Sequence, residues 1–299
     1  MTWGEIARKI GPLFSGSFWA AAVLKSEGIN LEKAGKAGMK IAYLGIDLLK
    51  PVLDALLNEG CRVLKLFTCP VDNVTEFNTA VIRTAERVGI PYTLDRITAA
   101  GLEELAAQGC ELLVCAGYYY LVPVTGAFPM VNFHPTPLPV GRGSWPMPRL
   151  ILEQAEFGGV TAHKMAADFD TGDILLQERF PLDGREDHRS YMEKVYEKVP
   201  GMVRALVRSL PETLANARPQ GQGEYWPLPT EADWTVTPDM DAALAGRILR
   251  AFYGYECVYR DGERKTELIG GRVTPGEPAG QPFPVQGGYI TADSARPLV

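Results

Sequence analysis

Histidine is scarce in this chain: only three occur among 299 residues, at positions 134, 163 and 188. Cysteine is little used as well, and the five cysteines show neither CxxC spacing nor a Cys/His metal-binding pattern. An odd number of scattered thiols is typical of reduced cysteines in a cytoplasmic protein. We therefore expect a cytoplasmic protein that holds no metal.

The chain also lacks an excess of positive charge and a long apolar run. Its net charge of −6 leaves no whole-protein positive field to attract a polyanion, so binding of nucleic acid would need a local basic patch. Residues 10–24 come nearest to a signal-peptide core, but Gly, Ser and Pro interrupt them and Glu5 precedes them. The segment is also too short to span a bilayer. We expect neither secretion nor membrane insertion.

Two well-known phosphate-binding patterns are missing. Gly45 follows an apolar run, but the segment LGIDLLKP lacks the G-x-G-x-x-G spacing that lets backbone approach a pyrophosphate, and no Walker A sequence occurs. Binding of a nicotinamide dinucleotide is therefore not expected.

What the sequence does contain, from Met39 onward, is a regular alternation of apolar runs with helical patterns. This alternation predicts a Rossmann-like, mostly parallel sheet with helices on both faces. The last helix of the series should kink or break at Pro200. The expected strands are residues 39–46, 62–68, 90–94, 111–117, 130–133, 159–166 and 174–182, and the expected helices are 47–60, 74–89, 99–109, 147–158 and 187–217.

Composition divides the chain into four parts. Residues 1–38 form an N-terminal extension, and residues 39–212 carry the α/β pattern. Residues 213–237 are rich in Pro, Gly, Gln and Trp, which is typical of a linker. Residues 238–299 begin with a helical pattern and continue with short strands, including a hairpin that turns at Asp261, so we expect a small β-rich C-terminal domain.

Three polar side chains stand where open α/β sheets place their ligands, just beyond the carboxyl ends of strands. Asn132 and His134 lie two apart on an extended segment, so their side chains share a face, and Asp170 follows the strand expected over residues 159–166. An amide, an imidazole and a carboxylate suit acyl transfer. The alternative interpretation is a loop histidine, a strand-end asparagine and an ordinary Asp-Thr-Gly-Asp turn.

The segments around these residues carry a resemblance. NFHPTPLPVGRGSWP, GGVTAH and DFDTGDIL are similar, in this order, to the motifs N-x-H-P-S-L-L-P, R-G-x-x-P, G-V-T-x-H and D-x-G of N10-formyltetrahydrofolate-dependent formyltransferases. The similarity covers roughly residues 39–215. The later segment EYWPLPTEADW, with the helix and hairpin that follow it, resembles the small OB-like C-terminal domain of methionyl-tRNA formyltransferases and their sugar-modifying relatives.

The resemblance implies transfer of a formyl group from N10-formyltetrahydrofolate to a primary amine. By position, it assigns Asn132 as donor to the oxyanion and His134 as general base or proton shuttle. It assigns Asp170 the role of raising the proton affinity of the imidazole and helping to relay protons to N10. His163 matches a family histidine and is expected to support the site or to pack, and His188 is expected to be solvated or to cap a helix.

The resemblance also places the two ligands. The folate is expected to meet backbone groups within residues 116–123 and within residues 165–170, the loop that leads to the catalytic aspartate. The acceptor amine is expected beside the Arg-Gly pair. The implied folate contacts are Tyr119, Leu121, Ala167 and Asp168, and the implied acceptor contacts are Arg142 and Gly143.

Departures from the family pattern bear on the acceptor. TPLP replaces the usual S-L-L-P at residues 136–139, and Gly141 stands where Tyr or Phe is usual. The basic, Gly-rich loop of tRNA formyltransferases is missing, and residues 69–80 are acidic instead. GYYYLVP, at residues 117–123, resembles enzymes that formylate amino sugars on nucleotides. We therefore favour a small-molecule amine, such as a nucleotide-linked amino sugar.

Three alternatives stay open. A methionyl-tRNA formyltransferase is favoured by the C-terminal domain, and basic residues in RILRAFY and RDGERK offer a local patch for tRNA. A formyltetrahydrofolate hydrolase would need only water in place of the amine. A non-catalytic folate- or nucleotide-binding module is disfavoured because all three polar residues are retained.

Overall fold

The computed structural model describes residues 38–73, 76–255, 257–278, 280 and 282–298. The expected N-terminal extension lies outside the described residues, apart from Gly38. Internal packing divides the described chain into two units. The first unit comprises residues up to 142, 159–178 and 195–223, and the second comprises residues 143–158, 179–194 and 224 onward. The domain and linker boundaries expected from the sequence stay predictions.

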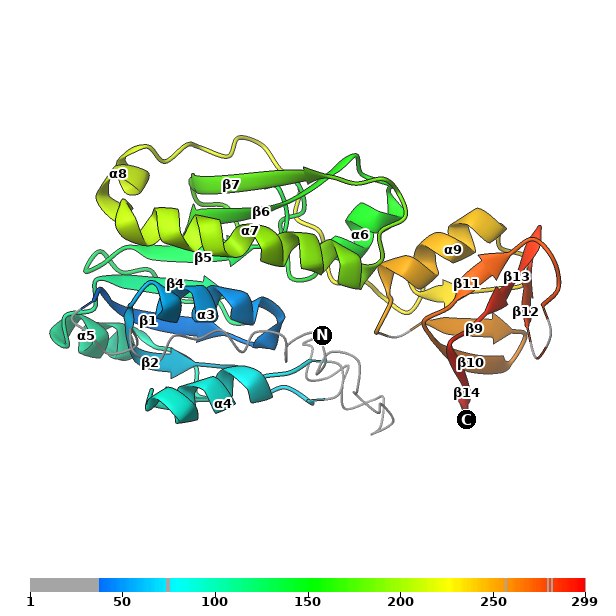
Figure 1. The fold of residues 1–299 in the computed structure, drawn as a ribbon, viewed down its shortest axis with the longest axis horizontal. Helices are drawn as coiled ribbons and strands as arrows, with labels where there is room; N and C mark the ends of the chain where they lie inside the picture. Colours follow the sequence, from blue (N-terminus) through cyan, green and yellow to red (C-terminus); the bar gives the residue numbers. More distant parts are fainter. Residues whose placement is uncertain (1–37, 74–75, 256, 279, 281, 299) are drawn as a thin grey trace. The chain divides into compact units, whose positions relative to one another are not determined.

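A seven-stranded sheet organises the α/β part of the chain (Figure 1). Its order is β3-β2-β1-β4-β5-β6-β7, and β1 to β5 pair in parallel whereas β6 runs antiparallel to β5. The mostly parallel sheet predicted from the sequence is thus confirmed. The strands are β1 (Lys40–Gly45), β2 (Arg62–Phe67), β3 (Tyr92–Thr93), β4 (Leu112–Ala116), β5 (Met130–His134), β6 (Phe157–Lys164) and β7 (Ile174–Pro181).

The helices follow the predicted order with different ends. Helix α7 continues through Pro200, so a break at that residue is wrong, and the alternative of a kink there stays a prediction. The chain breaks instead at Ser209, because Pro211 occupies the first turn of the next helix, where a missing N–H costs little. The helical elements are η1 (Asp47–Leu49), α3 (Lys50–Asn58), α4 (Thr79–Val88), α5 (Ala99–Ala107), α6 (Met147–Leu152), α7 (His188–Arg208) and α8 (Leu210–Ala215).

The start of α4 is set by a carboxylate from elsewhere in the sequence. Asp47 accepts hydrogen bonds from the backbone N–H groups of Ala80 at 2.9 Å and Val81 at 2.8 Å. These are donors in the first turn of a helix, which have no partner within the helix itself. The helix therefore begins at Thr79, later than the pattern over residues 74–89 predicts.

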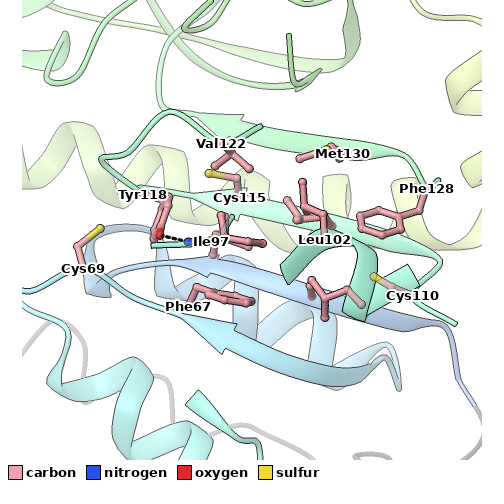
Figure 2. Packing of buried hydrophobic residues seen from close by; sticks show 14 of the residues in the cluster. Phe67, Cys69, Ile97, Leu102, Cys110, Cys115, Tyr118, Val122, Phe128 and Met130 are labelled. Carbon is pink, nitrogen blue, oxygen red and sulfur yellow. Dashed lines mark hydrogen bonds between the residues drawn. The ribbon is translucent and has the colours of Figure 1, made fainter. Parts of the chain in front are cut away.

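Helices cover both faces of the sheet. On one face, Ala42 and Leu44 of β1 join a buried apolar cluster that includes Leu102 of α5 (Figure 2). On the other face, the hydroxyl of Tyr43 donates to the backbone carbonyl of Leu49 at 3.5 Å, at the end of η1. This division follows from the alternation of side chains along a strand.

The same apolar cluster ends below the carboxyl ends of the parallel strands. Tyr118, two residues beyond β4, is buried there, and its hydroxyl accepts from the backbone N–H of Ile97 at 3.3 Å (Figure 2). The neighbours of β1 are β2 and β4, so the strand order reverses beside β1, where open α/β sheets leave a crevice for ligands. His134 is the last residue of β5 and therefore belongs to this edge.

The second unit contains the β-rich C-terminal part. It holds a four-stranded sheet, β14-β10-β9-β8, and a three-stranded sheet, β11-β13-β12. The predicted hairpin is confirmed, because β9 ends at Asp261 and pairs antiparallel with β10. Over the described residues, no helix is both long and apolar enough to cross a membrane. The elements are β8 (Thr235–Val236), α9 (Ala242–Ala251), β9 (Val258–Asp261), β10 (Arg264–Ile269), β11 (Arg272–Thr274), β12 (Phe283–Val285), β13 (Gly288–Thr291) and β14 (Ser294–Leu298).

The third histidine lies in the interior of the second unit. His188 is fully buried, so the expectation of a solvated residue is wrong. The indole N–H of Trp145 donates to its Nε2 at 3.1 Å, and the ring of Tyr255 packs edge-on at 4.8 Å. Burial lowers the pKa of His188 to about 3. The imidazole is therefore neutral at pH 7, with Nε2 as an acceptor.

This burial predicts acid sensitivity. Between the ordinary histidine pKa of 6.5 and about 3, the unfolded chain takes up a proton that folded His188 does not. Stability should then fall with decreasing pH, by up to about 1.4 kcal/mol per pH unit from this residue. His188→Gln keeps an acceptor for Trp145 but does not ionise. Urea unfolding between pH 4 and pH 7 should show a shallower pH dependence for the variant, and an unchanged slope would contradict the assignment.

Candidate active site

The predicted catalytic residues meet at the carboxyl end of β5. Asn132 and His134 lie on β5, and its antiparallel neighbour β6 places His163 opposite Asn132 and Thr161 opposite His134. Asp170 belongs to the loop between β6 and β7 and adopts a left-handed conformation, with φ of 56°. The carboxylate reaches both β5 side chains from there.

The two ring nitrogens of His134 have different partners. Nε2 lies 2.7 Å from the backbone carbonyl of Gly141, and since a carbonyl only accepts, Nε2 carries the hydrogen. In the neutral ring Nδ1 is then an acceptor, and it lies 3.4 Å from Oδ1 of Asp170. Burial lowers the pKa of His134, although Asp170 and the Gly141 bond act in the opposite direction. The ring is therefore a neutral base that faces a carboxylate able to share the proton it takes.

The amide of Asn132 is held by two acceptors. Nδ1 of His163 lies 2.8 Å from the backbone carbonyl of Lys164, so this nitrogen carries the hydrogen and Nε2 is left as an acceptor. The amide nitrogen of Asn132 lies 3.0 Å from that Nε2 and donates to Oδ1 of Asp170 at 3.2 Å. His163 thus supports the site by fixing the amide. The oxyanion role of Asn132 stays a prediction, and it requires one N–H to change partner.

The turn that carries Gly141 is held by hydroxyl groups. Thr161 donates to the carbonyl of Thr136 at 2.7 Å and accepts from the N–H of Leu138 at 3.1 Å. Thr136, at the position of the family serine, donates to the carbonyl of Val140 at 2.7 Å. These bonds fix the backbone that leads to Gly141, and therefore the carbonyl that orients His134.

Gln220 is a site residue that the sequence did not indicate. Its amide nitrogen donates to the carbonyls of Asp170, at 2.9 Å, and Gly172. Its Oε1 accepts from Nε and a terminal nitrogen of Arg142, at 3.1 and 3.0 Å. One side chain thus ties the catalytic aspartate loop to the Arg-Gly motif. It lies 50 residues beyond Asp170 in a stretch with linker composition, so no local pattern could have revealed it.

The boundary between the two units falls between the two residues expected to bind the acceptor. Arg142 donates to the carbonyls of Gly221 at 3.1 Å and Gly223 at 3.4 Å, in addition to the glutamine bond. Gly143 belongs to the second unit and adopts φ of 125°. A Cβ at Gly143 would lie 2.1 Å from the carbonyl oxygen of Trp226, so only glycine fits. Acceptor binding by either residue stays a prediction.

The tyrosines expected near the folate have distinct partners. The hydroxyl of Tyr119 donates to a carboxylate oxygen of Glu76, and its backbone N–H donates to Sγ of Cys69 at 3.4 Å. Tyr120 carries the guanidinium of Arg96 over its ring, 3.8 Å from the ring centre. The backbone N–H of Tyr119 is therefore engaged within the protein.

The other expected folate contacts lie at the surface of the first unit. Leu121 is 56% exposed, and Ala167 and Asp168 are exposed as well. Phe169, directly before the catalytic aspartate, is 43% exposed. Large apolar side chains left in solvent are typical of surfaces that bind a ligand, when several occur together. Folate contacts at these residues stay a prediction.

The site lies in a segment whose sequence matches a known family. The sequence pattern of the family described as Formyl transferase matches residues 78–207. The chain therefore contains a formyl transferase domain over these residues. The matched residues include β5, β6 and the aspartate loop, which carry the whole cluster.

Individual members of the family match over part of their length. Methionyl-tRNA formyltransferase of Treponema denticola is 33% identical over 156 residues, which cover 50% of this chain and 48% of the relative. The chain spans 48% to 60% of the first curated relatives it matches.

Solved structures of two further proteins share the fold. A sugar N-formyltransferase from a Shewanella species has a TM-score of 0.60 at 17% identity, with 77% of this chain and 96% of that chain covered. HypX from Aquifex aeolicus, in complex with tetrahydrofolic acid, has a TM-score of 0.61 at 15% identity, with 87% and 46% covered. At such low sequence identities, the similarity shows a shared fold and nothing beyond it.

The bonds of Gln220 predict a local effect of its replacement. Gln220→Glu keeps an acceptor for Arg142 but places a carboxylate against two carbonyl oxygens in place of a donor. We expect the loop around Asp170 to open more often. Two lost hydrogen bonds, each of about 1 kcal/mol, correspond to roughly tenfold faster amide exchange or more. Hydrogen exchange measured on peptides that cover residues 165–174 tests this.

Gln222→Glu is the matched control, because Gln222 is exposed two residues away and the charge change is the same. Its exchange in the aspartate loop should equal that of the unaltered protein. Equal protection in the Gln220 variant would show that the glutamine does not hold the loop.

Proposed function

We propose that this protein transfers a formyl group from N10-formyltetrahydrofolate to the primary amine of a small molecule, such as a nucleotide-linked amino sugar. The observation that carries the proposal is the cluster of half-buried Asn132 with buried His134 and Asp170. In it, a neutral imidazole with a free acceptor nitrogen faces a carboxylate across 3.4 Å. The match of residues 78–207 to the formyl transferase family supports the reaction class.

The cluster suits the proton transfers that such a reaction needs. N10-formyltetrahydrofolate would supply the formyl carbon. His134 would take the proton of the attacking amine at Nδ1, while the Nε2 bond to Gly141 holds the ring in place. Asp170 would stabilise the imidazolium, and since the pair is buried, this attraction is weakly screened. Asn132 would turn one N–H towards the developing oxyanion.

A folate donor is supported by the fold neighbour that contains tetrahydrofolic acid. The surface of the first unit fits a ligand with an apolar ring system, because the exposed Leu121 and Phe169 flank the segments that lead to the cluster. These residues would hold the ring system, and the cluster would act on the formyl group.

A small acceptor is supported by charge. The chain carries a net charge of −6, and residues 69–80 are acidic where tRNA formyltransferases have a basic loop. Of the basic residues in the β9–β10 hairpin, Lys265 is paired with Glu231. The curated relatives named methionyl-tRNA formyltransferase make an initiator tRNA the second candidate acceptor.

The direct test measures release of tetrahydrofolate from N10-formyltetrahydrofolate by the purified protein. Three reactions are compared: no acceptor, a panel of nucleotide-linked amino sugars, and methionyl-tRNA. We expect release that depends on an amino sugar and a formylated product detected by mass spectrometry. Dependence on methionyl-tRNA would move the assignment to the second candidate. Release without an acceptor would identify a hydrolase instead.

The role of His134 predicts the pH dependence of the rate. Activity requires neutral Nδ1, and the pKa of His134 lies below 6.5, so the acidic limb should fall below pH 6.5. Asp170→Asn removes the carboxylate that raises this pKa. The acidic limb should then move to lower pH while kcat falls by about 10²-fold or more. A limb that moves to higher pH, or stays in place, would contradict the pairing.

A further inference from the structure

The second unit contains a cavity that the proposed chemistry does not use. Its volume is about 530 Å³, within the range of sites for small ligands. The cavity lies against α9, which packs on β11 and β13. Gly246, in the middle of this helix, lines the cavity without adding a side chain to it. Glycine inside a helix costs about 1 kcal/mol relative to alanine, so the open space is kept at the expense of helix stability.

Three arginines line this cavity: Arg247 and Arg250, one turn apart on α9, and Arg272 at the start of β11. Within the described ranges, no carboxylate forms an ion pair with any of the three. The Nε atoms of Arg247 and Arg250 are buried without a hydrogen-bond partner. Buried donors of this kind normally have a partner, because leaving them without one costs about 1–3 kcal/mol each.

The surroundings offset this charge only in part. Burial lowers the pKa of Arg250, and the neighbouring charge of Arg247 lowers it further. Glu186 and Asp187 act in the opposite direction, but Glu186 is engaged by Lys194 at 2.5 Å. Among the described residues, Arg250 donates to a backbone carbonyl, that of Gly184, at 3.1 Å. Positive charge therefore accumulates in a partly enclosed space.

The N-terminal amides of α9 are not the source of this site. The side chain of Asp241 accepts from the N–H groups of Ala243 and Leu244, and the N–H of Ala242 donates to the carbonyl of Gln286. These donors are satisfied within the protein. The guanidinium groups remain as the donors available to a ligand.

We propose that this cavity binds a compact phosphate-bearing anion of about the size of a diphosphate. Guanidinium groups match phosphate oxygens with pairs of parallel hydrogen bonds, and three of them suit an anion with more than one negative charge. The site uses none of the residues of the catalytic cluster, and it is independent of which amine the enzyme formylates.

The test is titration of the full chain with inorganic pyrophosphate by isothermal calorimetry at constant ionic strength. We expect saturable binding of one pyrophosphate per chain. Arg247→Gln combined with Arg272→Gln should weaken it about 30-fold or more, because hydrogen bonds between charged groups contribute about 1.5–3 kcal/mol each. His134→Ala should bind as the unaltered protein does.

Two further variants separate a specific site from general charge and from misfolding. Arg264→Gln removes an exposed arginine of β10 outside the cavity and should change affinity less than about twofold. Gly246→Leu should abolish binding with every arginine in place, since a Cβ there meets only ordinary contacts at 3.6 and 3.7 Å and the longer side chain enters the cavity.

Three results would overturn the proposal. One is the absence of pyrophosphate binding, and another is an equal loss of affinity in the Arg264 variant. The third is a duplex RNA that binds through Arg247 and Arg272 while pyrophosphate does not, which would identify a nucleic-acid contact instead.

Discussion

The candidate site depends on one hydrogen bond, from Nε2 of His134 to the backbone carbonyl of Gly141. Both ring nitrogens face acceptors, but the contact with the carbonyl is the shorter, at 2.7 Å against 3.4 Å for the carboxylate. The hydrogen of the neutral ring is therefore on Nε2, and Nδ1 is left as the nitrogen that faces Asp170. If Nδ1 carried the hydrogen instead, the ring would donate to the carboxylate and could not act as a base there. The turn that carries Gly141 thus sets the tautomer of His134, and the tautomer decides which ring nitrogen can take a proton.

The backbone around the site is built to hold that geometry. The antiparallel strand β6 brings Thr161 and His163 against β5, where they fix the turn and the amide of Asn132. On the other side, Asp170 adopts φ of 56°, a conformation that aspartate tolerates better than most residues. A Cβ at Gly172 would lie 1.9 Å from the carbonyl oxygen of Lys164, so the loop can close only with glycine there. In the D-x-G motif, the glycine is therefore required by the backbone, whereas the aspartate supplies the carboxylate.

The sequence predicts those features of the site that depend on neighbouring residues, and it does not predict those that join segments far apart in the chain. The strands and the shared face of Asn132 and His134 follow from local periodicity, and both could be predicted. The bridge made by Gln220 joins segments distant in sequence, and no local pattern records it. A proline inside a helical pattern predicts a break at Pro200. The chain breaks at Ser209 instead, where Pro211 occupies the first turn of a new helix.

Two of the three buried histidines, His134 and His188, show why burial alone does not make a catalytic base. Burial lowers the pKa of both His134 and His188, and both are neutral at pH 7. Around His188 the rings of Trp145 and Tyr255 pack edge-on, and burial lowers the pKa of His188 to about 3. Around His134 the carboxylate of Asp170 opposes the effect of burial. That opposition gives His134 a charged partner for a proton that it takes, which a general base needs.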